Sequence, residues 1–289
     1  MPQKKQTDIE FVEQALAIEV EEAKKAGLIG YLSRALVQAT LPHSKRDGVE
    51  FTRRNGLYTL TIMTPSHAGG LPYGSIPRLL NYWITTEAVK TKSPYLTLGP
   101  TLSSFMAELD IMPTGGRWGS IVRLKDQMTR LFSSSISCIY EDQRQTRIRN
   151  VTVVEEANLW WSPKSPDQAT LWKSTLELNK RFFDELIQAP VPIHIDALKL
   201  LKKSPMALDI YSWLTYRMSY LRDNTCIPWK ALEMQFGSEY TETRYFKRAF
   251  CRELKKVLVI YRDAKVRPVD NGLLLKPSNT HIPRIIPSK

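Results

Sequence analysis

The chain has 289 residues, of which 43% are hydrophobic and 24% charged, a composition that excludes a disulfide-stapled miniprotein and a wholly disordered chain. Lysine and arginine (41) outnumber aspartate and glutamate (29), and the resulting net charge of +12 divides into +3 before residue 161 and +9 after it. A polyanionic partner is therefore expected, mainly for the C-terminal part.

The N-terminal part begins with a predicted helical segment, residues 1–40, in which apolar spacing over 8–40 favours helix with a break at 27–30. Asn55-Gly56 between alternating apolar residues predicts a hairpin of two strands, 49–53 and 57–64. The glycine- and proline-rich residues 69–78 predict a rigid turn, from which Ser75 caps a helix.

The next elements have the order of a winged helix. The sequence predicts a strand at 95–98, a helix at 102–109, a glycine turn at 112–116, a helix at 117–132, and a hairpin of 135–140 with 147–154. A helix-turn-helix followed by a hairpin is the winged-helix plan. Residues 41–161 are therefore predicted to form a first winged-helix domain.

The same order of elements returns after a boundary near residues 162–169, where prolines and serines interrupt the pattern. A strand is expected at 171–176, a closing hairpin at 258–261 with 273–276, and helices at 179–187, 196–202, 204–220, 229–236 and 239–257. The predicted fold class is α+β, with two tandem winged-helix domains, 41–161 and 170–289.

The helix predicted over 239–257 has one apolar and one basic face. Phe246, Phe250 and Leu254 recur at helical spacing and should face the core. A basic helix beside a wing fits the major groove of DNA, although a merely solvated basic face remains the alternative. The candidate DNA-binding residues of this domain are Arg244, Lys247, Arg248, Arg252 and Lys255 on the helix and Arg262, Lys265 and Arg267 in the wing.

The helix predicted over 117–132 repeats this pattern more weakly. Ile121, Leu124, Met128 and Leu131 mark its buried stripe. Ser120 and four further side chains are expected to face outward, where they could contact DNA, form a dimer surface, or only meet water. The candidate contact residues of this domain are Arg117, Arg123, Gln127 and Arg130.

Catalytic and metal-binding patterns are missing from the sequence. Three cysteines stand far apart, four histidines lie in unrelated contexts, and no phosphate-binding GxxxxGK[ST] loop is present. We expect no enzymatic activity, no cofactor and no metal; a metal-dependent nuclease is the weaker alternative. No apolar run is long enough for a membrane span or signal peptide, which favours a cytoplasmic protein with no membrane partner.

Four blocks carry a family resemblance: residues 41–44 (LPHS), 70–78 (GLPYGSIPR), 115–119 (GGRWG) and 127–132 (QMTRLF). They resemble recurrent blocks of the RepA-type replication initiator proteins of bacterial plasmids. The resemblance spans roughly residues 27–260.

The resemblance implies a plasmid replication initiator with two winged-helix domains. Such proteins bind repeated sites, iterons, in the double-stranded DNA of the plasmid origin, promote local melting, recruit the host replicative helicase together with host initiator proteins, and as homodimers repress their own promoter. It places the main groove contacts in the C-terminal domain, and auxiliary contacts and dimerisation in the N-terminal one. The alternative is a sequence-specific transcription repressor with no replication role, since the fold alone does not decide between the two.

Overall fold

The computed structural model describes residues 29–32, 37, 40–141, 144–162, 164–168, 173–188, 190–237 and 240–282. The chain divides into two compact units. Unit 1 comprises Met1–Thr40 with Val191–Lys289, and unit 2 comprises Leu41–Pro190. Each unit contains a winged helix, which confirms the predicted fold class, but the division lies at 40/41 and 190/191 and not at the expected 162–169.

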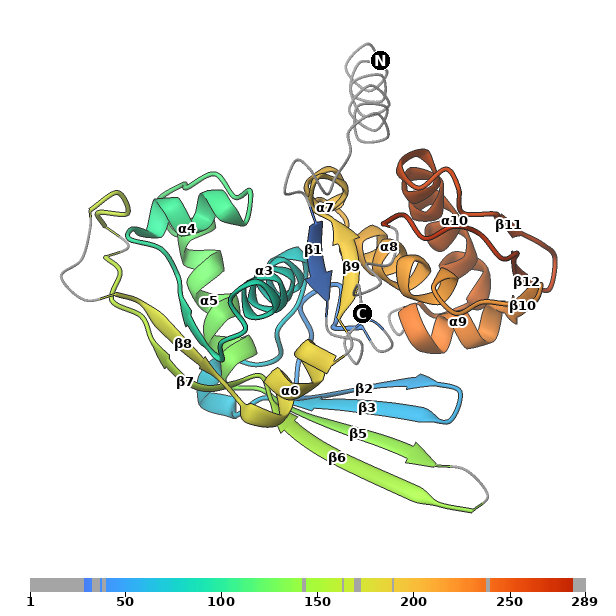
Figure 1. The fold of residues 1–289 in the computed structure, drawn as a ribbon, viewed down its shortest axis with the longest axis horizontal. Coiled ribbons are helices and arrows are strands. Elements are labelled where there is room, and N and C mark those ends of the chain that lie inside the picture. The colour runs from blue at the N-terminus through green and yellow to red at the C-terminus, as the bar shows by residue number, and fades with distance from the viewer. Residues whose placement is uncertain are drawn as a thin grey trace, which may run out of the picture. The chain divides into compact units, whose positions relative to one another are not determined.

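Unit 1 has the helix and strand order of a winged helix. Its strand β10 pairs with β12, and β12 pairs with β11, so the sheet order is β10-β12-β11 and the β11–β12 hairpin is the wing (Figure 1). Its elements are β1 (Ile29–Leu32), β9 (Val191–His194), α7 (Ile195–Leu201), α8 (Pro205–Met218), β10 (Thr225–Pro228), α9 (Trp229–Phe236), α10 (Thr243–Ile260), β11 (Val266–Pro268) and β12 (Gly272–Leu275).

Aromatic side chains fix α10 in unit 1. Phe250 lies with its ring centroid 5.5 Å from that of Phe236 and 5.5 Å from that of Phe246, and Phe236 lies 5.5 Å from Trp213 of α8. All four rings are buried. Their burial contributes a large share of the apolar area removed from water, so one face of α10 is committed to the core.

The N-terminal strand corrects one prediction. Residues 29–32, of which 29–30 were expected in a break and 31–32 in a helix, form β1 and pair antiparallel with β9, with Ile29 opposite His194 and Leu32 opposite Val191. Pro192 lies opposite Tyr31 in this two-stranded sheet, where an edge position tolerates the missing N–H group. The rest of the predicted helix before residue 29 lies outside the described residues.

Unit 2 contains a winged helix and a separate four-stranded sheet. Strands β4, β8 and β7 form one sheet, and β2, β3, β5 and β6 form the other, in which the two long hairpins run side by side (Figure 1). Its elements are β2 (Glu50–Asn55), β3 (Tyr58–Met63), the 3-10 turn η1 (Ser66–Ala68), α3 (Ser75–Thr91), β4 (Tyr95–Thr97), α4 (Leu102–Glu108), α5 (Ser120–Phe132), β5 (Ser135–Glu141), β6 (Thr146–Thr152), β7 (Val154–Asn158), β8 (Thr175–Leu178) and α6 (Lys180–Gln188).

The wing of unit 2 is not the hairpin expected from the sequence. The predicted hairpin exists as β5 and β6, but β5 pairs with β3. The strand that follows α3, β4, pairs instead with β8, and β8 pairs with β7. The wing position therefore belongs to β7 and β8, which flank the predicted domain boundary at 162–169.

Candidate nucleic-acid interface

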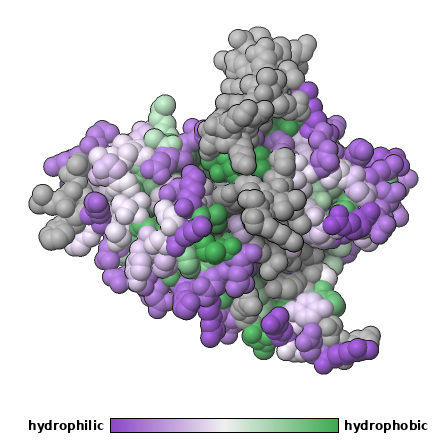
Figure 2. Space-filling view, in the orientation of Figure 1, coloured by the Kyte–Doolittle hydropathy of each residue, from purple (hydrophilic) through white to green (hydrophobic). Residues whose placement is uncertain are grey.

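The basic side chains of α10 lie on its outer face. Arg244, Arg248, Arg252 and Lys255 are exposed, whereas Phe246 and Leu254 of the same helix are buried. Hydrophilic residues dominate the surface over α10 and the wing strands (Figure 2). The predicted division of this helix into an apolar and a basic face is confirmed.

Lys247 joins α10 to the wing. Its ammonium group lies 3.4 Å from the backbone oxygen of Asp270, in the wing turn, and 5.0 Å from the ring centroid of Trp229 at the start of α9. The indole N–H of Trp229 in turn donates to the backbone oxygen of Val269 at 3.0 Å. Lys247 is accordingly only half exposed, and it positions the wing beside the helix.

The cations of α10 differ in how far they are already paired. Arg252 and Lys256 both donate to the buried carboxylate of Glu253, at 2.8 and 2.7 Å. Burial alone would raise the pKa of Glu253, but these hydrogen bonds bring the pKa below its ordinary value. Arg244 pairs with Glu242 at 2.9 Å. Within the described part of the chain, Arg248 and Lys255 form no ion pair, so their charges are the most available to a ligand.

The predicted wing cations are also at the surface. Arg262 and Lys265 lie in the connection from α10 to the wing, and Arg267 lies on β11; all three side chains are exposed. The backbone of Lys265 is held by Ser278, whose hydroxyl accepts from its N–H at 2.9 Å. The basic face of α10 and this cationic wing together are the candidate surface of unit 1.

In unit 2, three side chains expected to face outward are buried. Gln127 accepts a hydrogen bond from the backbone N–H of Tyr73 at 2.8 Å, and Arg130 pairs with Asp126 at 2.9 Å while donating to the backbone oxygen of Leu71 at 3.2 Å. Ser120 is buried as well. The assignment of Gln127 and Arg130 to a DNA contact surface is wrong, because the turn before α3 packs over this part of α5.

Exposed cations are also present on α5 and in its preceding turn. Arg117 and Arg123 are exposed, as predicted. Lys125 on α5 and Trp118 in the turn, which were not predicted as contact residues, are also exposed. A signal for Lys125 was present in the sequence, since it lies outside the buried stripe of Ile121, Leu124, Met128 and Leu131.

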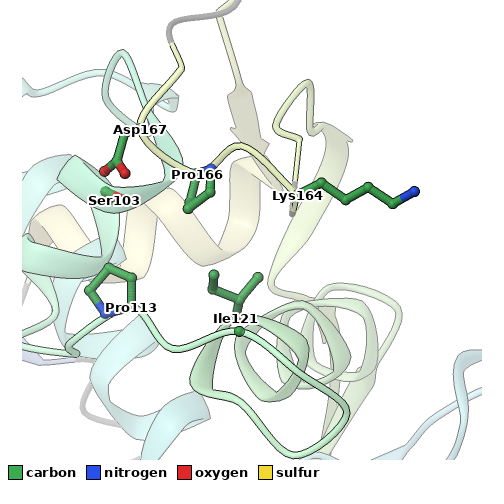
Figure 3. Close-up of a pocket in the computed structure, with 7 residues that line it drawn as sticks. Ser103, Pro113, Ile121, Lys164, Pro166 and Asp167 are labelled. Atoms are coloured by element: carbon green, nitrogen blue, oxygen red, sulfur yellow. The ribbon is translucent and has the colours of Figure 1, made fainter.

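A hollow of about 520 Å³ lies between this turn and the wing connection of unit 2. Pro113 and Ile121 line one side, and Lys164, Pro166 and Asp167 line the other, with Ser103 beside Asp167 (Figure 3). The backbone N–H of Ser103 donates to the backbone oxygen of Pro166 at 3.0 Å. This bond attaches the wing connection to α4, next to the helix-turn-helix.

Metal-binding and membrane-spanning features are not seen in the described residues. No group of three or more His, Cys, Asp or Glu residues among them is placed to hold a metal ion, and none of their helices combines the length and apolarity required to cross a bilayer. Among the described residues, Cys138, Cys226 and Cys251 take part in no disulfide bond.

A family model described as plasmid encoded RepA protein matches residues 71–230, more than half of the chain. The chain belongs to this RepA family. The match confirms the resemblance seen in the sequence and covers unit 2 from the turn before α3, together with unit 1 as far as the start of α9. The α10 surface lies beyond it. The chain matches no curated protein.

Two solved structures resemble the RepA-family chain in fold. A selenomethionine derivative of domains 2 and 3 of RctB has a TM-score of 0.53 at 13% identity, covering 84% of this chain and 95% of that one. A second structure of RctB domains 2–3 has a TM-score of 0.47 at 12% identity, covering 83% and 96%. The first likeness supports the fold assignment, and at this identity it supports nothing further.

Proposed function

We propose that this protein initiates plasmid replication by binding repeated sites, iterons, in the double-stranded DNA of the origin. The observation that carries the proposal is the exposed basic face of α10, positioned beside a cationic wing, in a chain of the plasmid RepA family. An α-helix fits the major groove of B-DNA, where arginine pairs with guanine edges. The wing cations then meet flanking phosphates.

We assign roles to the cations of this surface according to whether each one already pairs with another residue of the chain. Arg248, which no described residue pairs with, is the proposed base reader, with Arg244 at the helix start beside it. Lys255 is a proposed phosphate contact, as are the wing residues Arg262, Lys265 and Arg267. Lys247 and Arg252 are already engaged by Asp270 and Glu253, so they act mainly by shaping the surface.

Unit 2 provides the proposed auxiliary contact through Arg117, Arg123 and Lys125, whose charges suit phosphate oxygens. Once bound, the protein promotes melting of a neighbouring segment and recruits the host replicative helicase. As a homodimer it represses its own promoter. Binding and assembly are sufficient for these steps, so we propose no enzymatic turnover.

Footprinting the full chain on DNA on both sides of its own gene tests the proposal. We expect protection of direct repeats, lost in Arg248→Ala and retained in Lys180→Ala, which removes an exposed lysine of α6 outside the proposed surface. A plasmid fragment carrying the gene and its flank should replicate, and a frameshift should stop it. Protection without replication would instead identify a transcription repressor, and metal-dependent nicking of supercoiled DNA would identify a nuclease.

A further inference from the structure

The turn between α4 and α5 presents the two most exposed large apolar side chains of the described residues. Trp118 is 81% exposed and Met112 is 82% exposed. An indole ring left in water forgoes the large stabilisation that its burial provides in a core or at an interface. An exposed tryptophan beside a helix-turn-helix therefore points to a ligand that covers it.

The turn is rigid, so Trp118 is held in a defined place. Thr114 and Ser120 bond reciprocally, the N–H of each donating to the hydroxyl of the other at 2.8 Å, and the Ser120 hydroxyl donates to the backbone oxygen of Met112 at 2.7 Å. Gly119 leaves no room for change, since a Cβ atom there would lie 2.2 Å from the backbone oxygen of Thr114. A ligand that binds Trp118 therefore loses little entropy in ordering the loop.

The charge around Trp118 selects the class of ligand. Residues 111–125 contain three basic side chains, Arg117, Arg123 and Lys125, and no acidic one. The guanidinium carbon of Arg117 lies 5.2 Å from the ring centroid of Trp118. An exposed aromatic ring beside a guanidinium group, in a stretch without acidic side chains, suits a polyanion that carries flat aromatic groups, which is a nucleic acid.

We infer that Trp118 stacks on an unpaired nucleobase, while Arg117, Arg123 and Lys125 bind the adjoining phosphates. In a duplex each base face is covered by its neighbours, so the indole requires a base that has left the stack. Such a base comes either from a separated strand or from a nucleotide turned out of a distorted duplex. The inference rests on the proposed function, which supplies the opened DNA, and it assigns unit 2 a contact different in chemistry from that of α10.

Fluorescence anisotropy of labelled DNA with the full chain tests the inference. The probes are an oligothymidine strand, a fully paired duplex of unrelated sequence, and the same duplex with one unpaired thymidine. Trp118→Ala should weaken binding to the single strand by about tenfold, the scale of one stacked base, and leave the paired duplex unaffected. Trp118→Phe should retain most of the affinity. Met112→Ala, which removes an equally exposed apolar side chain, should have no effect.

The probes also distinguish the two sources of the base. A loss limited to the oligothymidine strand identifies a separated strand, and a loss limited to the unpaired thymidine identifies a turned-out base. Equal affinities of Trp118→Ala and the wild type on both probes overturn the inference. Equal losses in Trp118→Ala and Met112→Ala also overturn it, because they indicate a general effect of altering the turn and not the stacking of an indole on a base.

A failure of the proposed function gives a different result. In that case the wild type shows no preference for DNA from the flanks of its gene over unrelated duplex, while the effect of Trp118→Ala on the single strand remains. If Trp118 is not a stacking residue, the site-selective binding that depends on Arg248 persists and only the effect on the single strand disappears.

Discussion

The side-chain oxygen of Gln127 accepts a hydrogen bond of 2.8 Å from the backbone N–H of Tyr73. This bond joins the middle of α5 to the turn that precedes α3. Arg130, one helical turn later, donates to the backbone oxygen of Leu71 at 3.2 Å in the same turn. Gln127 and Arg130 thus fasten α5 to the turn before α3.

We predict that Gln127→Ala destabilises the protein by about 1 kcal/mol, because the half-buried N–H of Tyr73 loses its acceptor. The free energy of unfolding in urea measures the change. Arg123→Ala, on the exposed face of the same helix, should leave that free energy unchanged and weaken binding to DNA. The reverse pattern would place Gln127 on the ligand and not in the fold.

Gly119→Ala should cost about 1–3 kcal/mol of stability, because the added Cβ meets backbone oxygens that cannot move away independently. Gly115→Ala is the matched control: it lies in the same turn, where an added Cβ would have no neighbouring atom within 4 Å, and it should be neutral. Thermal unfolding of both variants gives the comparison. Equal melting temperatures would show that the turn is looser than its hydrogen bonds indicate.

Arg248→Ala should cost about 1–3 kcal/mol of binding free energy on the correct site and reduce discrimination at one base position. The reason is that a bidentate guanidinium contact to a guanine is lost. Binding curves on the wild-type site and on single-base variants measure both quantities. A loss shared equally by random DNA would reassign Arg248 to a phosphate.

Lys255→Ala should weaken binding uniformly across sequences and reduce the salt dependence by about one counterion. The slope of the logarithm of the binding constant against the logarithm of salt concentration measures this. Lys180→Ala serves again as a charge-matched control. An unchanged slope in Lys255→Ala would remove this residue from the interface.

A buried aromatic cluster gives unit 1 a pH dependence. The hydroxyl of Tyr211 accepts from the backbone N–H of His194 at 3.0 Å and lies 2.7 Å from Nδ1 of His281, whose ring stacks on Tyr261 with centroids 5.1 Å apart. Burial lowers the pKa of His281 to about 4, and the nearby His194 contributes to this shift, while Asp263 acts in the opposite direction. The folded state therefore keeps His281 neutral.

We predict that acid weakens unit 1 through His281. In the unfolded chain His281 becomes protonated near pH 6.5, whereas in the folded chain it becomes protonated only near pH 4. The stability gained by keeping His281 neutral is therefore fully present above about pH 6.5, and it is lost as the pH falls from 6.5 to 4. The full effect is about 3 kcal/mol. The free energy of unfolding in urea, plotted against pH, should have a smaller slope in His281→Gln than in the wild type. In His67→Gln, which replaces an exposed histidine, the slope should equal that of the wild type.

Local patterns in the sequence predicted most of the elements. Asn55-Gly56 marked the β2–β3 hairpin, the hydroxyl of Ser204 accepts from the N–H of Ala207 at the start of α8, and apolar spacing placed Phe246 and Phe250 in the core. These features depend on residues close together in the chain. The same spacing located the basic face of α10, because the apolar positions mark the buried side of the helix and the remaining positions mark its exposed side.

Strand partners and covered helix faces were not predicted, because they depend on distant residues. Nothing near Tyr95 indicates that β4 will pair with β8, about eighty residues later. Helical spacing groups Gln127 with Arg123, but it does not show that the turn at Leu71 covers the first and not the second. Both errors, in the partner of β4 and in the burial of Gln127, concern contacts between segments that are far apart in the sequence.

The pairing of β1 with β9 makes unit 2 an insertion within the chain of unit 1. During synthesis β1 is made before β9, and the whole of unit 2, about 150 residues, is made between them. At typical elongation rates this takes roughly ten to thirty seconds. Unit 2 can fold first, and unit 1 can complete its fold only after residues 191–289 have been synthesised. A fragment that begins at residue 191 would lack this strand and leave β9 without the strand that it pairs with.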